Sequence, residues 1–150
     1  MSAAWDIPTQ WAYYADNGRG LCIEFDVTQE CGFNRLYRVK YEEARPMLNM
    51  ARLIARAKGA ADELHSAVLS KAPSWSHEVE YRAMYNSMGV QEYPAGMLKS
   101  IILGPMCSAE DELWLRNLIA ESCLDGVSLE RAQTSDEDYS FSRVRCGPES

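Results

Sequence analysis

Histidine and paired cysteines are scarce in this sequence of 150 residues. It holds two histidines, His65 and His77, and five cysteines, with no C-x-x-C pair and no cysteine at ligand spacing from a histidine. A structural zinc site needs four such ligands, and a disulfide framework normally uses an even number of cysteines. We therefore expect no metal or other cofactor, and free thiols in a reducing cytoplasm.

Long apolar runs are absent as well. No stretch approaches the roughly 20 apolar residues that a membrane-spanning helix needs. The start, Met1–Asp6, has no basic region followed by an apolar one. These absences predict a cytoplasmic protein that is neither secreted nor inserted in a membrane.

Basic residues are too few for a broad nucleic-acid surface. Fifteen Lys and Arg against 22 Asp and Glu give a net charge of −7, whereas binding along phosphates needs a basic face. The basic residues are dispersed except for Arg52, Arg56 and Lys58. These three fit one solvated helix face, with a phosphate or partner contact as the alternative.

What is present is the composition of a globular protein. The apolar fraction is 47% and the charged fraction 25%, and the length suffices for one domain with a core of its own. We predict a single domain over residues 1–150, with residues 1–9 and 147–150 loosely ordered. Pro8 discourages a helix in the first of these segments.

Hydrophobic periodicity predicts an α+β fold. Leu21, Ile23, Phe25 and Val27 alternate with polar residues, as in a half-buried strand. Similar reasoning gives strands over 21–27, 37–41, 75–83, 98–104, 127–131 and 139–144, a short helical turn over 10–17, and helices over 45–71 and 108–126. Pro46 suits the first turn of the long helix, and Gly59 divides it.

The predicted order is β-β-α-β-β-α-β-β, a mainly antiparallel sheet with helices packed on one face in two layers. The strands 21–27 and 37–41 are expected to pair through a turn at Cys31–Asn34. The predicted helix-covered face carries Leu21, Ile23, Phe25, Tyr37, Val39, Val79 and Tyr81. The predicted open face is polar and carries Glu24, Asp26, Arg38, Lys40, Glu78, Glu80 and Arg82.

The segment from Trp75 to Arg82 is the most informative one. On a strand, Glu78, Glu80 and Arg82 would lie in a row on one face. His77 would lie on the apolar face, as a core histidine. Such a row is either a surface charge ladder or the floor of a site.

Two motifs resemble one bacterial family, domain of unknown function 2971. Trp11-Ala12-Tyr13-Tyr14-Ala15-Asp16-Asn17 followed by Gly20-Leu21-Cys22-Ile23-Glu24-Phe25-Asp26 is similar to its W-x-H-Y-A-D-N-x-x-G-x-C-I-x-F-D signature. Lys71 with Trp75-Ser76-His77-Glu78-Val79-Glu80-Tyr81-Arg82 is similar to its K-x-x-x-W-x-x-E-x-E-[WY]-R motif. A weaker third likeness is Ile101-Ile102-Leu103-Gly104 before a helix.

The resemblance implies a bacterial or phage origin and no established activity. Two departures stand out. Tyr13 replaces the histidine of the signature, and the family's usual N-terminal portion with its N-D-P motif is not seen, so we expect a reduced or inactive version if either completes an active site.

Glu78 and Glu80 are the candidate catalytic residues. Two neighbouring carboxylates can divide into acid and base by shifting their pKa values apart. Alternatively, one carboxylate holds a ribose hydroxyl while Arg82 binds a phosphate. The structural alternative pairs them across strands with Arg38 and Lys40.

The candidate ligand-binding residues are Tyr14, Trp75, Arg82, Trp11 and Asp16. Trp75 either stacks on a ligand ring or anchors the core. Tyr14 with Glu80 is also loosely similar to the tyrosine and glutamate of ADP-ribosyltransferase folds, in which they would stack on nicotinamide and stabilise an oxocarbenium-like centre. A reactive Cys22 or Cys123 paired in space with His77 is a further alternative.

Three functions follow as hypotheses. The first is an accessory domain that binds a small molecule or nucleotide on its polar sheet face, where Tyr14, Trp75 and Glu80 converge on a pocket. The second is an ADP-ribosyltransferase-like enzyme acting on NAD. The third is a protein-interaction module, a homo-oligomer formed through aromatics near Trp5 and Trp11 or through an open sheet edge.

Overall fold

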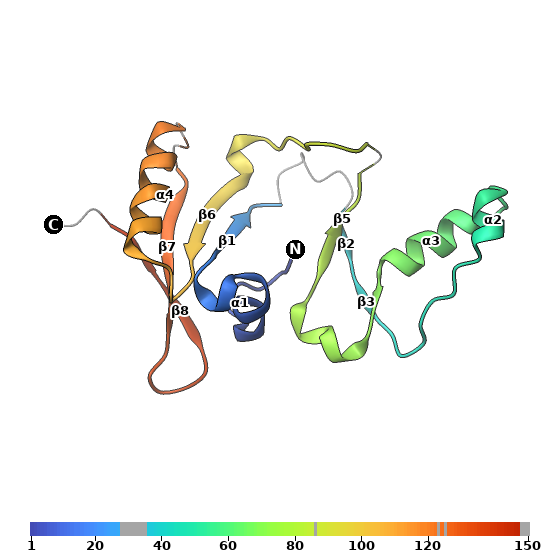
Figure 1. The fold of residues 1–150 in the computed structure, drawn as a ribbon, viewed down its shortest axis with the longest axis horizontal. Coiled ribbons are helices and arrows are strands. Elements are labelled where there is room, and N and C mark those ends of the chain that lie inside the picture. The colour runs from blue at the N-terminus through green and yellow to red at the C-terminus, as the bar shows by residue number, and fades with distance from the viewer. Residues whose placement is uncertain (28–35, 86, 123, 125, 148–150) are drawn as a thin grey trace. The chain divides into compact units, whose positions relative to one another are not determined.

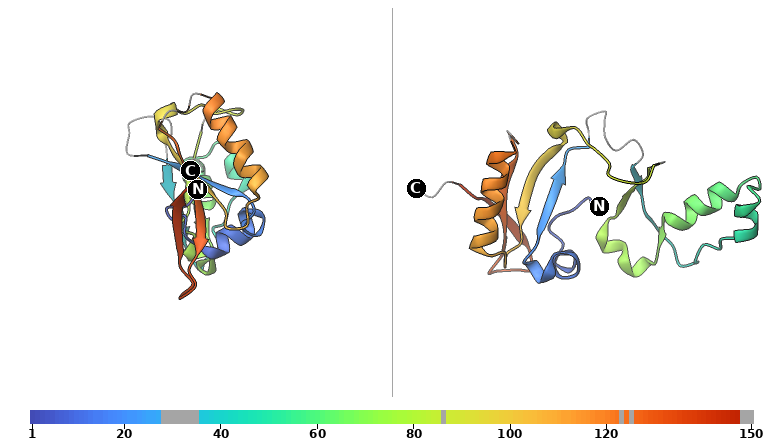
Figure 2. Two further views of the ribbon diagram at one scale, coloured as in Figure 1. Left: turned by 90° about the vertical axis from the view of Figure 1, so that its left-hand side faces the viewer. Right: turned by 45° about the horizontal axis from the view of Figure 1, so that its top comes forward.

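The structure, a computed structural model, describes residues 1–27, 36–85, 87–122, 124 and 126–147. These residues form two compact units. Unit 1 comprises Met1–Ala4 and Asn34–Met88, and unit 2 comprises Trp5–Phe33 and Gly89–Ser150. Figure 1 and Figure 2 show the elements of each. The α+β class is confirmed, whereas a single domain stays a prediction.

Unit 2 contains the main sheet, whose four strands lie in the order β1-β6-β7-β8. Their bounds are Leu21–Phe25, Leu98–Leu103, Ser128–Thr134 and Phe141–Arg145. The outer pairs are antiparallel and β6–β7 is parallel. Because a parallel pair needs a crossover connection, α4 (Ala109–Glu121) runs between β6 and β7. The mainly antiparallel sheet is therefore confirmed.

Helices cover both faces of the main sheet, which corrects the prediction of one covered face. Ile101 and Leu103 of β6 pack with Leu115 of α4. Ile102, on the opposite face, packs with Trp11 of α1 (Pro8–Tyr14). The nearly continuous apolar run of β6 is the physical reason, since a central strand buried on both faces needs cover on both.

The alternating burial predicted for β1 is confirmed, but the face that we predicted to be covered by helices was wrong. Cys22 packs against the cluster around Trp11, whereas Leu21 and Ile23 are 38% and 47% exposed. Alternation defines two faces without saying which is covered. Glu24 lies on the Cys22 face, where it accepts hydrogen bonds from Ser100 (2.5 Å) and Arg143 (2.9 Å).

Unit 1 is built from two small ribbons. β2 (Leu36–Arg38) pairs with β5 (Tyr81–Ala83) in antiparallel fashion, and β3 (Lys40–Tyr41) pairs with β4 (Ser70–Lys71) in parallel. The predicted pairing of strands 21–27 and 37–41 is therefore wrong, because β1 pairs with β6 instead. The turn predicted at Cys31–Asn34 lies outside the described residues.

Two helices follow β3 in unit 1, α2 (Met50–Ile54) and α3 (Ala60–Val68). Gly59 separates them as predicted and has a φ of 81°. Pro46 does not begin a helix, because α2 starts after Asn49, whose side chain accepts from the Arg52 amide at 3.1 Å. In unit 2, Pro8 begins α1, although we expected it to discourage a helix; proline fits the first turn.

The segment 75–83 is only partly a strand, which corrects the prediction there. A 3-10 helix, η2 (Pro73–Glu78), precedes the left-handed residue Val79, and β5 begins at Tyr81. The Trp75 and Val79 amides donate to Ala72 and Ser76 oxygens at 3.0 and 3.3 Å. These bonds close turns that an extended chain cannot form. The remaining 3-10 turns are η1 (Asp16–Gly18) and η3 (Ala95–Met97).

In the described part of the chain, no helix combines the length and apolar character needed to span a bilayer. A cytoplasmic location and a bacterial or phage origin stay predictions.

Candidate functional site

The Lys71 ammonium lies at the centre of the candidate site in unit 1. It binds the carboxylates of both Glu78 and Glu80, the latter at 3.0 Å. Glu78 is buried, with 5% of its side chain exposed, and the Lys71 side chain is 19% exposed. Burial alone would lower the pKa of Lys71, but its bonds to Glu78 and Glu80 outweigh that effect and raise it. Lys71 therefore stays charged.

Glu80 is held from two sides. Its Oε1 accepts from Nε of Arg82 at 2.7 Å, and its Oε2 accepts from Nη2 of Arg82 at 3.2 Å. The Arg82 hydrogen bond lowers the pKa of Glu80 against the opposing effect of burial, and the Lys71 bond lowers it further. Since Glu80 stays ionised, it is suited to binding a hydrogen-bond donor or stabilising positive charge, and is a weak proton acceptor.

Val79 sets the geometry of the two carboxylates. It has φ 46° and ψ 50°, a left-handed conformation that is a genuine outlier for a β-branched residue. The chain turns sharply between Glu78 and Glu80, and both still reach one ammonium. Backbone held in such a conformation is typical of functional sites. The partners of Glu78 and Glu80 are therefore Lys71 and Arg82, and not the predicted Arg38 and Lys40 of the neighbouring strands.

Aromatic side chains lie beside this network. The Lys71 ammonium is 5.0 Å from the centre of the Trp75 ring, a cation–π distance. Trp75 is 37% exposed, and its ring stacks on His77 with centres 6.1 Å apart. His77 is exposed, so its prediction as a core histidine was wrong; the 3-10 turn replaces the strand that would have buried it. The Tyr41 hydroxyl accepts from the Glu80 amide at 2.8 Å.

Lys71 and Tyr41 were missed as site residues, and His77 was considered only as a core histidine or as the partner of a reactive cysteine. Lys71 had a signal, since it opens the second family motif. Tyr41 and His77 had none, because their contacts depend on the pairing of β3 with β4 and on the turn at Val79.

Arg82 keeps capacity for a ligand. Three of its five N–H groups donate within the described part of the chain, two to Glu80 and one, from Nη1, to the carbonyl of Val68. Its side chain is 32% exposed. The remaining two N–H groups can bind an anionic oxygen, while Glu80 holds the guanidinium in a fixed orientation.

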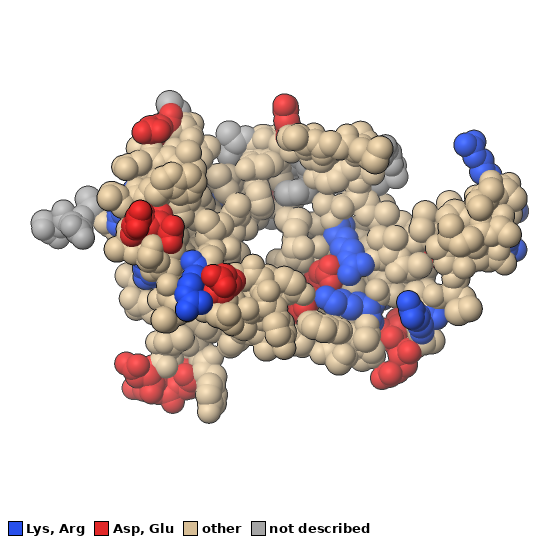
Figure 3. All heavy atoms as spheres, in the orientation of Figure 1, with Lys and Arg blue, Asp and Glu red and all other residues tan. Residues whose placement is uncertain are grey.

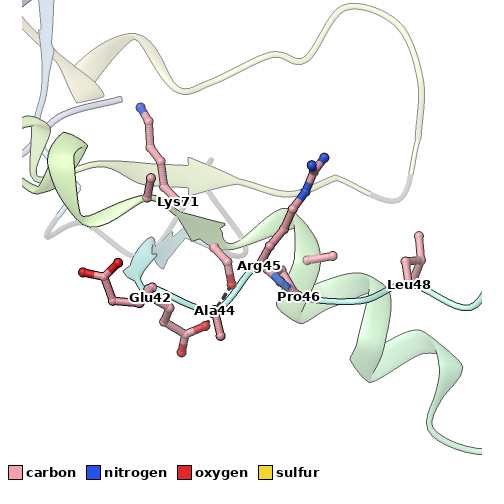
Figure 4. Close-up of a pocket in the computed structure, with 10 residues that line it drawn as sticks. Glu42, Ala44, Arg45, Pro46, Leu48 and Lys71 are labelled. Carbon is pink, nitrogen blue, oxygen red and sulfur yellow. Dashed lines mark hydrogen bonds between the residues drawn. The ribbon is translucent and has the colours of Figure 1, made fainter.

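A hollow of about 560 Å³ adjoins the cluster in unit 1. Its polar wall includes Glu42, Arg45 and Ser70, and the Ser70 hydroxyl donates to Glu42 at 3.3 Å and to the Ser66 carbonyl at 2.8 Å. Successive residues of a strand face opposite ways. Accordingly, Figure 4 shows the Lys71 side chain rising from β4 away from the Glu42 carboxylate. Lys71 itself also lines the hollow, so the hollow and the ion-pair network meet at this residue.

The other predicted ligand-binding residues belong to unit 2. Trp11 is 5% exposed, and its indole N–H donates to the Trp5 carbonyl at 2.8 Å, as a core residue does. Tyr14 is 67% exposed, next to Tyr13 in an edge-to-face contact. Asp16 is exposed and left-handed, with φ 45°. The convergence of Tyr14 with Trp75 and Glu80 stays a prediction.

Other chemistries have less support from the residues described. Burial raises the pKa of the Cys22 thiol, which makes it a poor nucleophile at neutral pH; Cys123 lies outside the described residues. Among residues with a described position, no three His, Cys, Asp or Glu side chains are grouped as ligands for a metal ion. Figure 3 shows acidic and basic side chains intermixed on the visible face.

Comparison with known proteins gives a match to one family model. A family model described as Protein of unknown function (DUF2971) matches residues 10–83. The match covers both motifs in which the resemblance was recognised, and that resemblance is confirmed. Neither a curated protein nor a solved structure matches the chain.

Proposed function

We propose that unit 1 of this chain, whose residues 10–83 match the DUF2971 family model, binds a small anionic ligand with a planar ring, of the nucleotide class. The observation that carries the proposal is that the side chains of the second family motif contact one another in a single network. Lys71, Trp75, Glu78, Glu80 and Arg82 form one network around a strained residue.

The polar groups of the network suit a phosphorylated sugar. Arg82 is oriented by Glu80, and two of its five N–H groups have no acceptor among the described residues, so they can bind a phosphate oxygen. From the residues that the structure describes, Glu80 receives three hydrogen bonds, and a carboxylate has about four lone-pair sites. One site therefore remains for a ribose hydroxyl.

The aromatic groups suit a base. Trp75 and His77 form a stacked, exposed pair next to the ionic network, and flat aromatic surfaces stack on nucleobases with little dependence on sequence. Because Glu80 stays ionised, a binding role is favoured over an acid–base pair formed with Glu78.

The test is a titration followed by NMR at the Trp75 indole N–H, assigned from a Trp75→Phe variant. The probes are AMP, NAD, ribose 5-phosphate and inorganic phosphate. We expect saturable shifts with AMP and NAD, and at least tenfold weaker binding in Glu80→Gln and Arg82→Gln, because each removes one charge of the oriented pair.

Matched controls come from the same unit. Arg52 and Glu63 form an ion pair at 3.1 Å between α2 and α3. Arg52→Gln and Glu63→Gln carry the same substitutions, so they should leave affinity unchanged. Absence of a saturable shift with all four probes would refute the proposal. Consumption of NAD that Glu80→Gln abolishes would favour the enzyme, and a mass that rises with concentration without ligand binding would favour the interaction module.

A further inference from the structure

We infer that the segment Met1–Ala4 is a docked edge strand that positions the Glu78–Val79–Glu80 turn and thereby sets the affinity of the site. The inference rests on the proposed function for its effect on binding. It names Ser2 and Ala3 as positioning residues, which act through the turn and do not touch a ligand.

The docking is made by backbone hydrogen bonds along β5. Met1 and Tyr81 exchange two of them, at 2.8 and 3.0 Å, and Ser2 forms an antiparallel bridge with Glu80. β2 pairs with the other edge of β5. The N-terminal segment thus extends this sheet, as in the addition of an extended peptide to a sheet edge.

Two further bonds reach the strained turn itself. The Ser2 hydroxyl donates to the Glu78 carbonyl at 2.7 Å, and the Ala3 amide donates to the Val79 carbonyl at 3.1 Å. They hold the peptide units on either side of the left-handed Cα of Val79. A left-handed conformation is unfavourable for a β-branched residue, so it persists only where surrounding bonds such as these hold it.

The opposite side of Glu80 is fixed independently. Its amide donates to the Tyr41 hydroxyl at 2.8 Å, and its carbonyl accepts from the Val39 amide at 2.9 Å. The backbone of Glu80 is therefore also fixed from the side away from the N-terminal segment. The Glu78 and Val79 carbonyls accept from Ser2 and Ala3, so we expect release of the segment to change how Glu78 and Glu80 share the Lys71 ammonium.

The experiment uses paired substitutions in the full chain. Ser2→Ala removes the hydroxyl donor, and Ser2→Thr keeps it. Ala3→Pro removes the amide donor, and Ala3→Gly keeps it. Two quantities are measured for each variant: the affinity for AMP, and the carboxyl pKa of Glu80 from side-chain ¹³C NMR.

We expect Ser2→Ala and Ala3→Pro to weaken AMP binding at least about fivefold and to move the Glu80 pKa toward its ordinary value. Ser2→Thr and Ala3→Gly should retain both properties. Glu24 is the internal reference, since its pKa is also lowered, against burial, by Ser100 and Arg143 of unit 2. An unchanged Glu24 shows that unit 2 is intact.

The two claims fail separately. If wild type binds none of the probes, the proposed function fails, and the Glu80 titration still tests the positioning role. If AMP binding and the Glu80 pKa are the same in Ser2→Ala, Ala3→Pro and wild type, the positioning role is overturned while the proposed function stands.

Discussion

At the scale of single residues, Lys71 organises the site. Its ammonium neutralises Glu78, whose side chain is 5% exposed, and also binds Glu80. Removing the charged partner of a buried carboxylate is strongly destabilising, because the carboxylate has lost hydration and then loses an ion pair. We therefore expect the charge of Lys71 to stabilise unit 1 as well as to organise the site.

Replacing Lys71 by methionine tests this requirement. Lys71→Met keeps the length of the side chain and removes its charge, so we expect a loss of about 3 kcal/mol in the free energy of unfolding. Lys40→Met is the control in the same unit, because Lys40 is exposed and such changes stay within about 0.5 kcal/mol. Urea unfolding measures both, and equal values would contradict the assignment.

The lowered pKa of Glu80 predicts a pH dependence. A carboxyl group with a depressed pKa in the folded state stabilises above its ordinary value of about 4.5. That contribution is lost as the pH falls through the folded pKa, because the unfolded chain then binds more protons. We expect Glu80→Gln to show a smaller loss of stability below pH 4.5 than wild type. Identical pH profiles from urea unfolding would refute this.

The sequence indicated most residues of the candidate site, whose role stays a prediction, but not how they are arranged. Glu78, Glu80, Arg82 and Trp75 were recognised from charge, aromaticity and the family motif. Their convergence depends on the left-handed Val79, and a β-branched residue gives no sequence signal for that conformation. Periodicity therefore predicted a straight strand and did not predict the contacts of Lys71 with Glu78 and Glu80.

At the scale of elements, the end of β6 depends on a close backbone approach. A Cβ on Gly104 would lie 2.1 Å from the Gly18 oxygen and 3.0 Å from that of Gly20. The Gly104 amide donates to Gly20 at 2.9 Å, and the Met106 amide donates to Gly18 at 2.9 Å. Any side chain at this position must push the two segments apart and break these bonds.

Gly104→Ala should therefore destabilise the protein by about 3 kcal/mol, as a severe overpacking does. Gly96→Ala is the matched control, since a Cβ there meets nothing within 4 Å. Thermal unfolding of the two variants separates the steric effect from the general effect of replacing glycine. A Gly104→Ala variant as stable as Gly96→Ala would contradict the described approach.

The positions of helices and strands were predicted better than the pairing of the strands. The strands of the main sheet and the division at Gly59 followed from periodicity and glycine. The helix predicted to start at 108 is α4, and the Ser108 side chain caps it by accepting from the Asp111 amide at 3.0 Å. Strand pairing was wrong for 37–41, because alternation is a local property whereas β2 meets β5 more than 40 residues away.

At the scale of the whole molecule, burial is unequal between the units. Both apolar clusters lie in unit 2. In the described part of unit 1, the buried apolar residues are Val39, Ala60 and Leu69. Its β3–β4 ribbon is two-stranded and its β2–β5 ribbon is extended only by the short segment Met1–Ala4, and such small ribbons are marginally stable without a sizeable core.

Amide hydrogen exchange should therefore be faster in unit 1 than in unit 2. We expect protection factors in β5 at least about tenfold below those in β6, since local opening free energies follow buried contacts. Exchange in β5 should slow when AMP is bound, because a ligand stabilises the state that binds it. Equal protection of β5 and β6 without ligand would contradict this division.

The most direct measurement is the NMR titration of AMP at the Trp75 indole in wild type, Glu80→Gln and Glu63→Gln. The proposed site predicts a saturable shift in wild type and Glu63→Gln, with at least tenfold weaker binding in Glu80→Gln. Equal affinities in all three proteins, or no saturable shift in wild type, would contradict it.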